Sequence, residues 1–248
     1  MNDSILINGQ RLFVNAQDQR GQRLLQTGSA FSPVAQSLWR HLLGLADWDL
    51  VVDVGANYGE MLLEIPLDSR AEVVAFEANP ALLPYLRATL AQRAVTLEAL
   101  AVCERTGTAQ FHIDATWSGA SSLATPRTAG SGNHIDLMHV PTTTLDQYFA
   151  HSQARRACIK IDVEGVEPFV LLGAQQWFAR LDDYALLVEI RHATAEVLAA
   201  LATHWRLFLW DVREGRFVRM HADGLLARGE GWHRDDAVLL PLGGRLAF

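Results

Sequence analysis

The sequence predicts an α/β fold: a doubly wound, mostly parallel sheet. Five short runs are apolar and rich in β-branched residues, and most are separated by stretches of helical character. Continuous apolar strands are typical of a parallel sheet that is covered on both faces. Strands that alternate with helices predict the doubly wound arrangement. The expected strands are residues 50–54, 73–76, 95–102, 159–163 and 185–190.

An N-terminal cap of about 46 residues precedes the first of these strands. Residues 5–14 alternate as in a short hairpin, and a helix is expected over 32–46. Ser32 is placed as its N-cap and Pro33 as its first residue, the position at which proline is favoured.

The stretch after the third expected strand interrupts the alternation. It holds one expected strand, 109–113, and then a loop rich in Gly, Ser, Ala and Thr over 114–133. Long loops in compact domains are usually functional or disordered, so 114–133 is a candidate substrate loop. A helix is expected to start at Leu145 and Asp146. Two final strands are expected at 205–210 and 237–242, with an Arg-bearing loop between them.

Length and composition indicate one globular domain over residues 1–248. Half of the residues are apolar and a fifth are charged, which excludes a disordered or collagen-like chain. A chain of this size buries about three-quarters of its unfolded surface and needs neither disulfide nor metal to fold. Cys103 and Cys158 fit no CxxC pattern and are expected to be reduced and buried.

The charge balance limits the expected partners and location. The formal net charge is -7, whereas nucleic-acid binders gain affinity from clustered Lys and Arg, so no nucleic-acid partner is expected. The first residues lack a positive segment followed by an apolar one, and nowhere do 18 consecutive apolar residues occur. We therefore expect no membrane span and a cytoplasmic protein.

The segment DVGANYG at 53–59 is placed where the first strand turns into a helix. Gly55 and Gly59 allow a sharp turn and a close approach to a ligand at the carboxyl end of the strand. A dinucleotide fingerprint requires GxGxxG, but the spacing here is GxxxG. The Asp53 carboxylate would repel a pyrophosphate and attract the ammonium and sulfonium groups of S-adenosylmethionine. The loop therefore favours this cofactor.

Glu77 lies at the end of the second expected strand, directly after residue 76 and about 20 residues after the glycines, where a carboxylate can bind both hydroxyls of a ribose. NAD sites share this position, so it indicates a nucleoside, and Asp53 favours S-adenosylmethionine. An exposed acid at a strand end is the alternative.

Charged residues occur in and after the fourth expected strand. Alternation puts Lys160 and Asp162 on one face, where an unpaired buried charge would cost several kcal/mol. They should pair or touch a ligand, and for Lys160 a structural ion pair and a catalytic role are equally open. Asp162 and Glu164 lie at the carboxyl end of the strand, which favours a functional role for both.

Several motifs together resemble the FkbM family of S-adenosylmethionine-dependent methyltransferases, over about residues 51–190. They are VVDVGANYGE, AFEANP, the start Thr144-Leu145-Asp146 and IKIDVEGVEPFVLLGA. The resemblance implies a class I methyltransferase with a Rossmann-like, seven-stranded sheet that methylates hydroxyls of sugars, glycans or polyketide-like molecules. It implies that Asp53, Gly55, Ala56, Asn57 and Gly59 hold the methionine end of the cofactor, Glu77 the ribose, and Ala101 and Val102 the adenine side. Ala78, where the family usually has Pro, and Asp162 complete the expected cofactor set.

Methyl transfer to a hydroxyl requires alignment of the acceptor and removal of its proton. The candidate bases are Asp162, Glu164 and His192. We favour His192, because it follows the fifth strand and imidazole has a suitable pKa, with Asp162 orienting acceptor and cofactor. Lys160 remains a further catalytic candidate.

The sequence gives no zinc-site spacing among its histidines. Asp162, Glu164 and His192 could hold Mg²⁺, but the adjacent Lys160 argues against it, so no metal is expected. In the candidate substrate loop, Trp117, Ser121 and Ser122 are expected to stack on and hydrogen-bond a sugar. A loop whose tryptophan packs against the core is the alternative.

Three classes of function stay open. An O-methyltransferase with a small-molecule or glycan acceptor is favoured. A nicotinamide-dependent oxidoreductase is disfavoured, because the sequence lacks the GxGxxG motif of such enzymes. A non-catalytic methyltransferase-like binding subunit is disfavoured, because it would not need the intact glycine loop, Glu77 and IDVEG.

Overall fold

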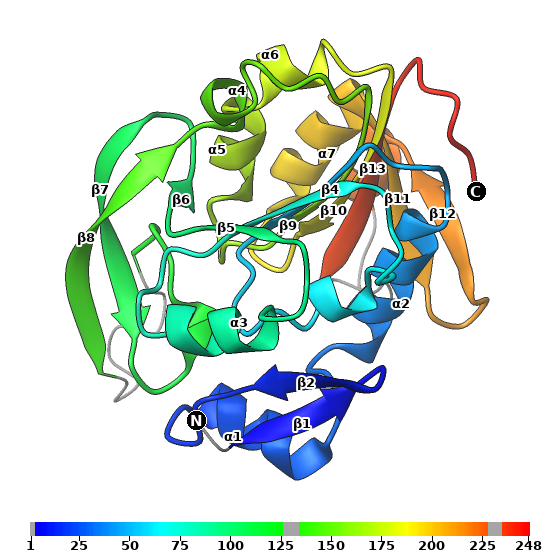
Figure 1. Ribbon diagram of the computed structural model, residues 1–248. Coiled ribbons are helices and arrows are strands. Elements are labelled where there is room, and N and C mark those ends of the chain that lie inside the picture. The colour runs from blue at the N-terminus through cyan, green and yellow to red at the C-terminus, as the bar shows by residue number, and fades with distance from the viewer. Residues whose placement is uncertain (1–2, 126–133, 228–234) are drawn as a thin grey trace.

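The computed structural model describes residues 3–125, 134–227 and 235–248. In these residues the chain forms a large mixed sheet with helices on both faces, a two-stranded N-terminal hairpin and a three-stranded side sheet (Figure 1). The α/β class with a doubly wound, Rossmann-like sheet is therefore confirmed.

The large sheet has the strand order β12-β11-β13-β10-β9-β3-β4-β5. The five strands from β10 to β5 run parallel, while β13 is antiparallel to both β10 and β11. The strands are β3 (Leu50–Val54), β4 (Glu72–Phe76), β5 (Thr96–Glu98), β9 (Arg156–Ile161), β10 (Asp183–Glu189), β11 (Trp205–Asp211), β12 (Arg216–Met220) and β13 (Asp236–Pro241).

The described part of this sheet has eight strands, one more than the seven expected. The additional strand, β12, lies in the segment expected to be an Arg-bearing loop and forms an antiparallel hairpin with β11. Its turn contains Gly215 at φ +62°. Arg216 and Arg219 interrupt its apolar residues, as is common in edge strands. The segment therefore has no continuous apolar run, and the strand was not predicted.

Successive residues of the central strands point to opposite faces of the sheet, and each face is covered by its own hydrophobic core. Both sets of residues are therefore apolar, which explains the continuous apolar runs in the sequence. On β3, Val52 belongs to one core and Val51 to the other. The first face is covered by α4 (Leu145–Tyr148), α5 (Glu167–Leu172), α6 (Gln175–Phe178) and α7 (Ala195–His204). The second face is covered by α2 (Pro33–Leu43), η1 (Leu62–Glu64) and α3 (Leu83–Thr89).

The N-terminal cap forms largely as predicted. Strands β1 (Ser4–Ile7) and β2 (Gln10–Phe13) pair through a turn at Asn8 and Gly9. Helix α2 begins after Ser32, whose side chain accepts a hydrogen bond from the Ala35 backbone. Helix α1 (Gln19–Thr27), capped by Asp18, was not predicted.

The side sheet differs from the sequence prediction in two ways. The single strand expected over 95–102 is wrong, because β5 ends at Glu98 and β6 (Ala101–Val102) pairs with β8 in the side sheet. Strand β8 (Ile135–Thr143) was also missed; it is mostly exposed and contains Pro141. It pairs with β7 (Gly107–Asp114), which contains the expected strand 109–113.

Other features agree with the sequence, as far as the structure describes them. Helix α4 starts after Thr144, whose hydroxyl accepts from the Gln147 backbone. Cys103 and Cys158 are free and buried. Residues 126–133 of the candidate substrate loop lie outside the described residues. No described helix, including the last one, α8 (Ala222–Ala227), is long and apolar enough to cross a membrane.

Candidate active site

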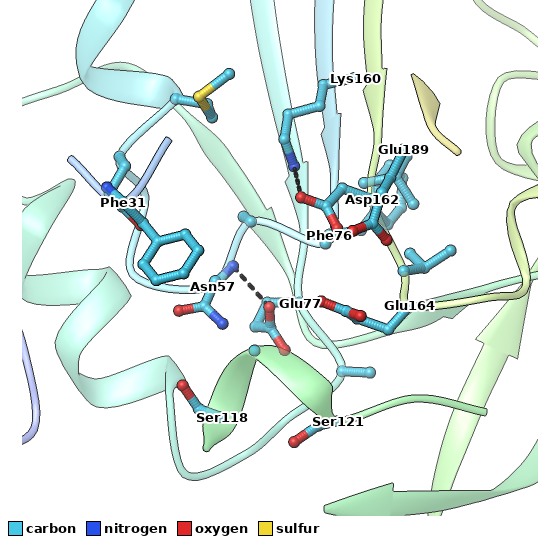
Figure 2. A pocket seen from close by; sticks show the side chains of 18 of the residues that line it. Phe31, Asn57, Phe76, Glu77, Ser118, Ser121, Lys160, Asp162, Glu164 and Glu189 are labelled. Carbon is cyan, nitrogen blue, oxygen red and sulfur yellow. Dashed lines mark hydrogen bonds and ion pairs between the residues drawn. The ribbon is translucent and has the colours of Figure 1, made fainter. Parts of the chain in front are cut away.

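A large cavity lies at the carboxyl ends of β3, β4, β9 and β10, where doubly wound sheets bind their ligands (Figure 2). It encloses about 1230 Å³, counting the space at its open mouth. The N-terminal cap contributes Arg20, Phe31 and Gln36 to its wall, so the cavity is closed by residues far apart in the sequence.

The glycine loop is shaped by positive φ angles at both glycines and by a backbone contact at Gly55 that leaves no room for a side chain. Gly55 has φ +85°, and a Cβ atom there would lie 1.9 Å from the carbonyl oxygen of Asp162. Gly59 has φ +94°, and its Cβ would lie 2.8 Å from Leu86 Cδ1. Gly55 thus brings the ends of β3 and β9 together at the cavity, while Gly59 packs against α3 and does not line it.

Glu77 is placed as a ribose ligand would be. Its Oε2 accepts a hydrogen bond from the Asn57 backbone and its Oε1 one from the Asn79 backbone, each at 2.7 Å (Figure 2). Burial raises the pKa of Glu77 to about 6, although both backbone hydrogen bonds act to lower it. Glu77 is only 6% exposed, so the alternative of an exposed strand-end acid is wrong.

The wall beside Glu77 is apolar and suits an adenine ring. Ala78, Ala101 and Val102 line the cavity, as expected, together with Leu100 and Phe111. Ala56 and Asn57 line it at the glycine loop. The residues present therefore fit S-adenosylmethionine: a fixed carboxylate for the ribose, an apolar wall for the base and a glycine turn for the methionine end.

Lys160 lies between two carboxylates. Its Nζ is 3.5 Å from Oδ1 of Asp53 and 3.1 Å from Oδ2 of Asp162. Although burial acts to lower the pKa of Lys160, the charges of Asp162 and Asp53 hold it above the usual range. Lys160 is thus a buried cation in an ion pair, which argues for its structural reading and against a role as a base. Lys160 and Asp162 line the cavity, whereas Asp53 lies outside its lining.

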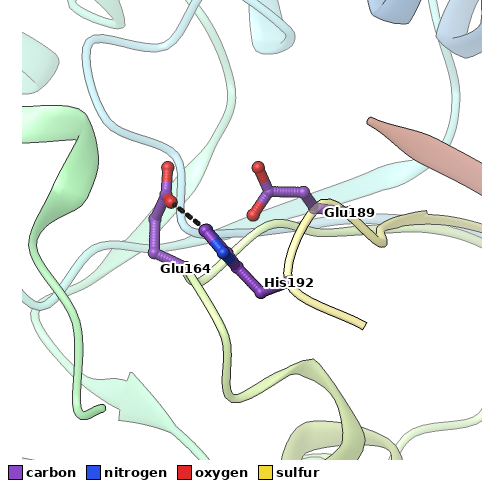
Figure 3. A group of neighbouring side chains, drawn as sticks. All are labelled: Glu164, Glu189 and His192. Carbon is purple, nitrogen blue, oxygen red and sulfur yellow. Dashed lines mark hydrogen bonds and ion pairs between the residues drawn. The ribbon is translucent and has the colours of Figure 1, made fainter. Parts of the chain in front are cut away.

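A second group of titratable side chains, Glu164, Glu189 and His192, which we call the edge trio, lies after the end of β9 and at the end of β10 (Figure 3). Glu164 Oε2 is 3.1 Å from His192 Nε2. Glu164 has φ +59°, an unusual conformation for a residue other than glycine. The Glu167 carboxylate supports this turn by accepting hydrogen bonds from the Val163 and Gly165 backbone.

The edge trio places two carboxyl groups close together in a largely buried position. Burial, and then the charge of Asp162, raises the pKa of both Glu164 and Glu189 above the usual carboxyl range. Both glutamates line the cavity, but His192 is not among the lining residues. The structure thus brings together Asp162, Glu164 and His192, as predicted, and adds Glu189, the last residue of β10.

Arg20 is a cavity residue that sequence reasoning missed. It forms an ion pair with Glu60 and donates a hydrogen bond to Asn57 Oδ1 at 3.0 Å. Its guanidinium lies over the rings of Phe31 and Tyr58. Arg20 belongs to α1, which the sequence did not predict, and no motif marks it.

The three candidate substrate residues have different surroundings. Trp117 and Ser121 line the cavity, and the Trp117 ring meets the edge of Phe31 at a centroid distance of 5.3 Å. Ser121 Oγ accepts from the Asp114 backbone at 3.1 Å. Ser122 does not line the cavity; its hydroxyl donates to the Val163 carbonyl oxygen at 2.9 Å and anchors the loop.

Fold and site together define an S-adenosylmethionine-dependent methyltransferase of the class I, Rossmann-like type. Residues 53–218 match the family described as the methyltransferase FkbM domain, so the chain belongs to this family. This confirms the resemblance and the cofactor, and the nicotinamide-dependent oxidoreductase is thereby rejected.

Comparisons with other proteins give distant structural likenesses. An S-adenosylmethionine-dependent O-methyltransferase from Thermotoga maritima has 12% identity and a TM-score of 0.48, covering 92% of this chain and 72% of that one. A precorrin-6y C5,15-methyltransferase from Geobacter metallireducens has 12% identity and a TM-score of 0.42, covering 85% of this chain and 87% of that one. No curated protein sequence matches the chain.

Proposed function

We propose that this methyltransferase transfers the methyl group of S-adenosylmethionine to a hydroxyl of a sugar, glycan or polyketide-like small molecule. The observation that carries the proposal is the position of Asp162. Its backbone carbonyl oxygen lies against Gly55 of the glycine loop, and the residue lines the cavity together with Glu164 and Glu189, so its carboxylate is available to both the cofactor and the acceptor (Figure 2).

The cofactor is oriented by charges of both signs. Glu77 accepts hydrogen bonds from the ribose hydroxyls, since each of its oxygens accepts one backbone hydrogen bond among the described residues and a carboxylate oxygen has two lone pairs. Arg20, held beside Asn57, supplies the cation for the α-carboxylate of the methionine end. Asp162 provides the opposite charge for the ammonium group.

The bound cofactor supplies a methyl group on a positively charged sulfur. An acceptor oxygen held beside Asp162 would bond to this carbon, and the sulfur would keep the electron pair of the broken carbon–sulfur bond. The hydroxyl proton passes to Asp162, whose carboxylate is 36% exposed and can release it to water. Because His192 does not line the cavity, we assign it to support of Glu164 and not to direct proton removal.

The acceptor class is suggested by the aromatic side chains that line the cavity. Phe31 and Trp117 form an aromatic pair there, and aromatic faces pack against sugar rings and similar cyclic ligands. Ser121 also lines the cavity and adds a hydroxyl group to it, and its Oγ lies 3.4 Å from Nδ2 of the buried Asn79.

The test is a panel of glycosides and polyol macrocycles incubated with S-adenosylmethionine and analysed by mass spectrometry for a gain of one methylene. Asp162→Asn should lower turnover by about 10² to 10⁴-fold while binding of S-adenosylhomocysteine persists. Asp182→Asn, at an exposed ion pair with Arg155, is the matched control and should behave as wild type. Methyl gain on amines but on no hydroxyl would contradict the proposal, and absence of any turnover would favour a non-catalytic binding subunit.

A further inference from the structure

The edge trio offers three metal-binding side chains from two separate segments. Among the described residues, one possible ligand atom from each of Glu164, Glu189 and His192 lies within 4.8 Å of the other two. Glu164 follows β9, whereas Glu189 ends β10 and His192 lies three residues later. Figure 3 shows their side chains converging on one region.

Glu189 supplies an observation that points to a missing partner. The residue is 93% buried, being 7% exposed, and its Oε2 is fully buried with no hydrogen-bond partner among the described residues. Its other oxygen, Oε1, is 3.7 Å from Arg191 Nε, too far for a hydrogen bond. A buried carboxylate oxygen without a partner is costly unless a cation or donor satisfies it.

The geometry of the pair Glu164–His192 suits a common cation. Two ligand atoms bound at about 2.1 Å and at right angles around one ion are about 3 Å apart. The 3.1 Å between Glu164 Oε2 and His192 Nε2 meets this spacing. Glu164 has a strained, positive φ, and its side chain points toward His192 (Figure 3).

Among the described residues, Lys160 and Arg191 are two nearby cations that are held by other carboxylates. In the sequence analysis, the adjacent Lys160 argued against a metal site. In the structure Lys160 is paired with Asp53 and Asp162, so this argument does not apply to the edge trio. Arg191 lies 3.4 Å from Asp235 Oδ1 and approaches Glu189 only on its Oε1 side.

We propose that Glu164, Glu189 and His192 bind a divalent cation of the Mn²⁺ class, with open coordination positions toward the cavity. Two carboxylates and one imidazole match the preferences of such an ion, and three protein ligands leave room for water or an acceptor oxygen. The inference rests on the proposed function for its role: the ion holds the acceptor hydroxyl beside Asp162, which accepts the proton as the methyl group is transferred.

The binding test uses the whole protein without acceptor, so it is independent of turnover. Titration with Mn²⁺, followed by electron paramagnetic resonance of the free ion, should show one bound ion per chain. Glu189→Gln and His192→Asn should each weaken Mn²⁺ binding by at least about tenfold. Asp235→Asn removes an equal charge beside Arg191 but outside the trio and should change Mn²⁺ binding little.

Binding of S-adenosylhomocysteine by every variant shows that the fold is retained. Wild-type protein that binds S-adenosylhomocysteine but takes up no Mn²⁺ at millimolar concentration would overturn the inference. So would an equal loss of Mn²⁺ binding in Asp235→Asn and Glu189→Gln, because it would indicate a general effect of charge. Once an acceptor is known, chelation should raise its KM at least about tenfold, and an unchanged KM would overturn the role of the ion in holding the acceptor.

Discussion

The ammonium of Lys160 lies 3.5 Å from the carboxylate of Asp53, and both side chains are almost completely excluded from water. Adjacent strands β9 and β3 place the two residues opposite each other in the parallel register. A charge pair in this position belongs to the core of the sheet as much as to the cavity that Lys160 lines.

Lys160→Met is therefore expected to destabilise the protein by about 3 to 5 kcal/mol, because it leaves the Asp53 carboxylate buried and unpaired. Adding Asp53→Asn should recover part of this loss, since the unpaired charge is then removed as well. Urea denaturation of the two single variants and the double variant measures the coupling. Arg155→Met, at an exposed ion pair with Asp182, serves as the control and should have little effect. Additive losses at positions 53 and 160 would contradict the assigned pair.

Glu77→Ala is expected to weaken cofactor binding by about ten- to a hundredfold, since a hydrogen bond to a charged group contributes about 1.5 to 3 kcal/mol. Calorimetry with S-adenosylhomocysteine measures the change. Glu72→Ala, at the opposite and exposed end of β4, removes the same charge and should bind normally. An affinity equal to that of the wild type in Glu77→Ala would remove the ribose assignment.

Because Glu77 is expected to bind the ribose, its ionisation should make cofactor affinity depend on pH. Burial raises the pKa of Glu77 to about 6, so its contribution to the stability of the unliganded protein is present at low pH and lost as pH rises through about 6. Cofactor affinity changes with pH in the opposite direction: it is higher above about pH 6, because the ionised carboxylate is the better acceptor for the ribose hydroxyls. Affinity for S-adenosylhomocysteine should therefore fall as pH drops below about 6.

Two variants identify the group responsible for this pH dependence. Glu77→Gln should bind more weakly and with a flatter pH profile. Burial also raises the pKa of Asp53 to about 6, but Asp53 does not line the cavity, so Asp53→Asn should keep the dependence. A profile that flattens in Asp53→Asn and persists in Glu77→Gln would reverse the assignment.

The parts of the site that the sequence predicted are those fixed by local spacing. Gly55 and Glu77 each follow a buried strand, and parallel strands bring their carboxyl ends to one edge. Glu189 was not among the predicted site residues, because nothing in its local sequence shows that its Oε2 would be buried without a hydrogen-bond partner among the described residues. Arg20 reaches the cavity through packing of α1 against the loop at Asn57, a long-range contact that no spacing encodes.

The same distinction applies to the fold. The central strands were predicted because both of their faces are buried, which makes them continuously apolar. Strands β8 and β12 were missed because many of their residues are exposed or only half-buried, so polar residues interrupt the apolar pattern. Each of the two segments forms a strand because it pairs with a neighbouring strand, and the local sequence does not show this pairing. The split between β5 and β6 depends on the side sheet, whose main pairing joins β7 to β8.

Trp117 gives a test of the acceptor side of the cavity. Its ring packs against Phe31 of the N-terminal cap and lines the cavity, while Glu77 and the adenine wall involve other residues. Trp117→Ala should therefore raise the acceptor KM by about three- to tenfold, in line with the 0.5 to 1.5 kcal/mol of an aromatic contact, and leave cofactor affinity unchanged.

Steady-state kinetics with an identified acceptor, together with calorimetry for S-adenosylhomocysteine, separates the two effects. Trp210→Ala is the matched control, because Trp210 forms a similar edge contact with Phe217 and does not line the cavity. The opposite pattern in Trp117→Ala, with cofactor binding lost and the acceptor KM kept, would place this segment over the cofactor. The acceptor would then have to enter from the side of Glu164 and Glu189, since these residues line the cavity at the ends of β9 and β10.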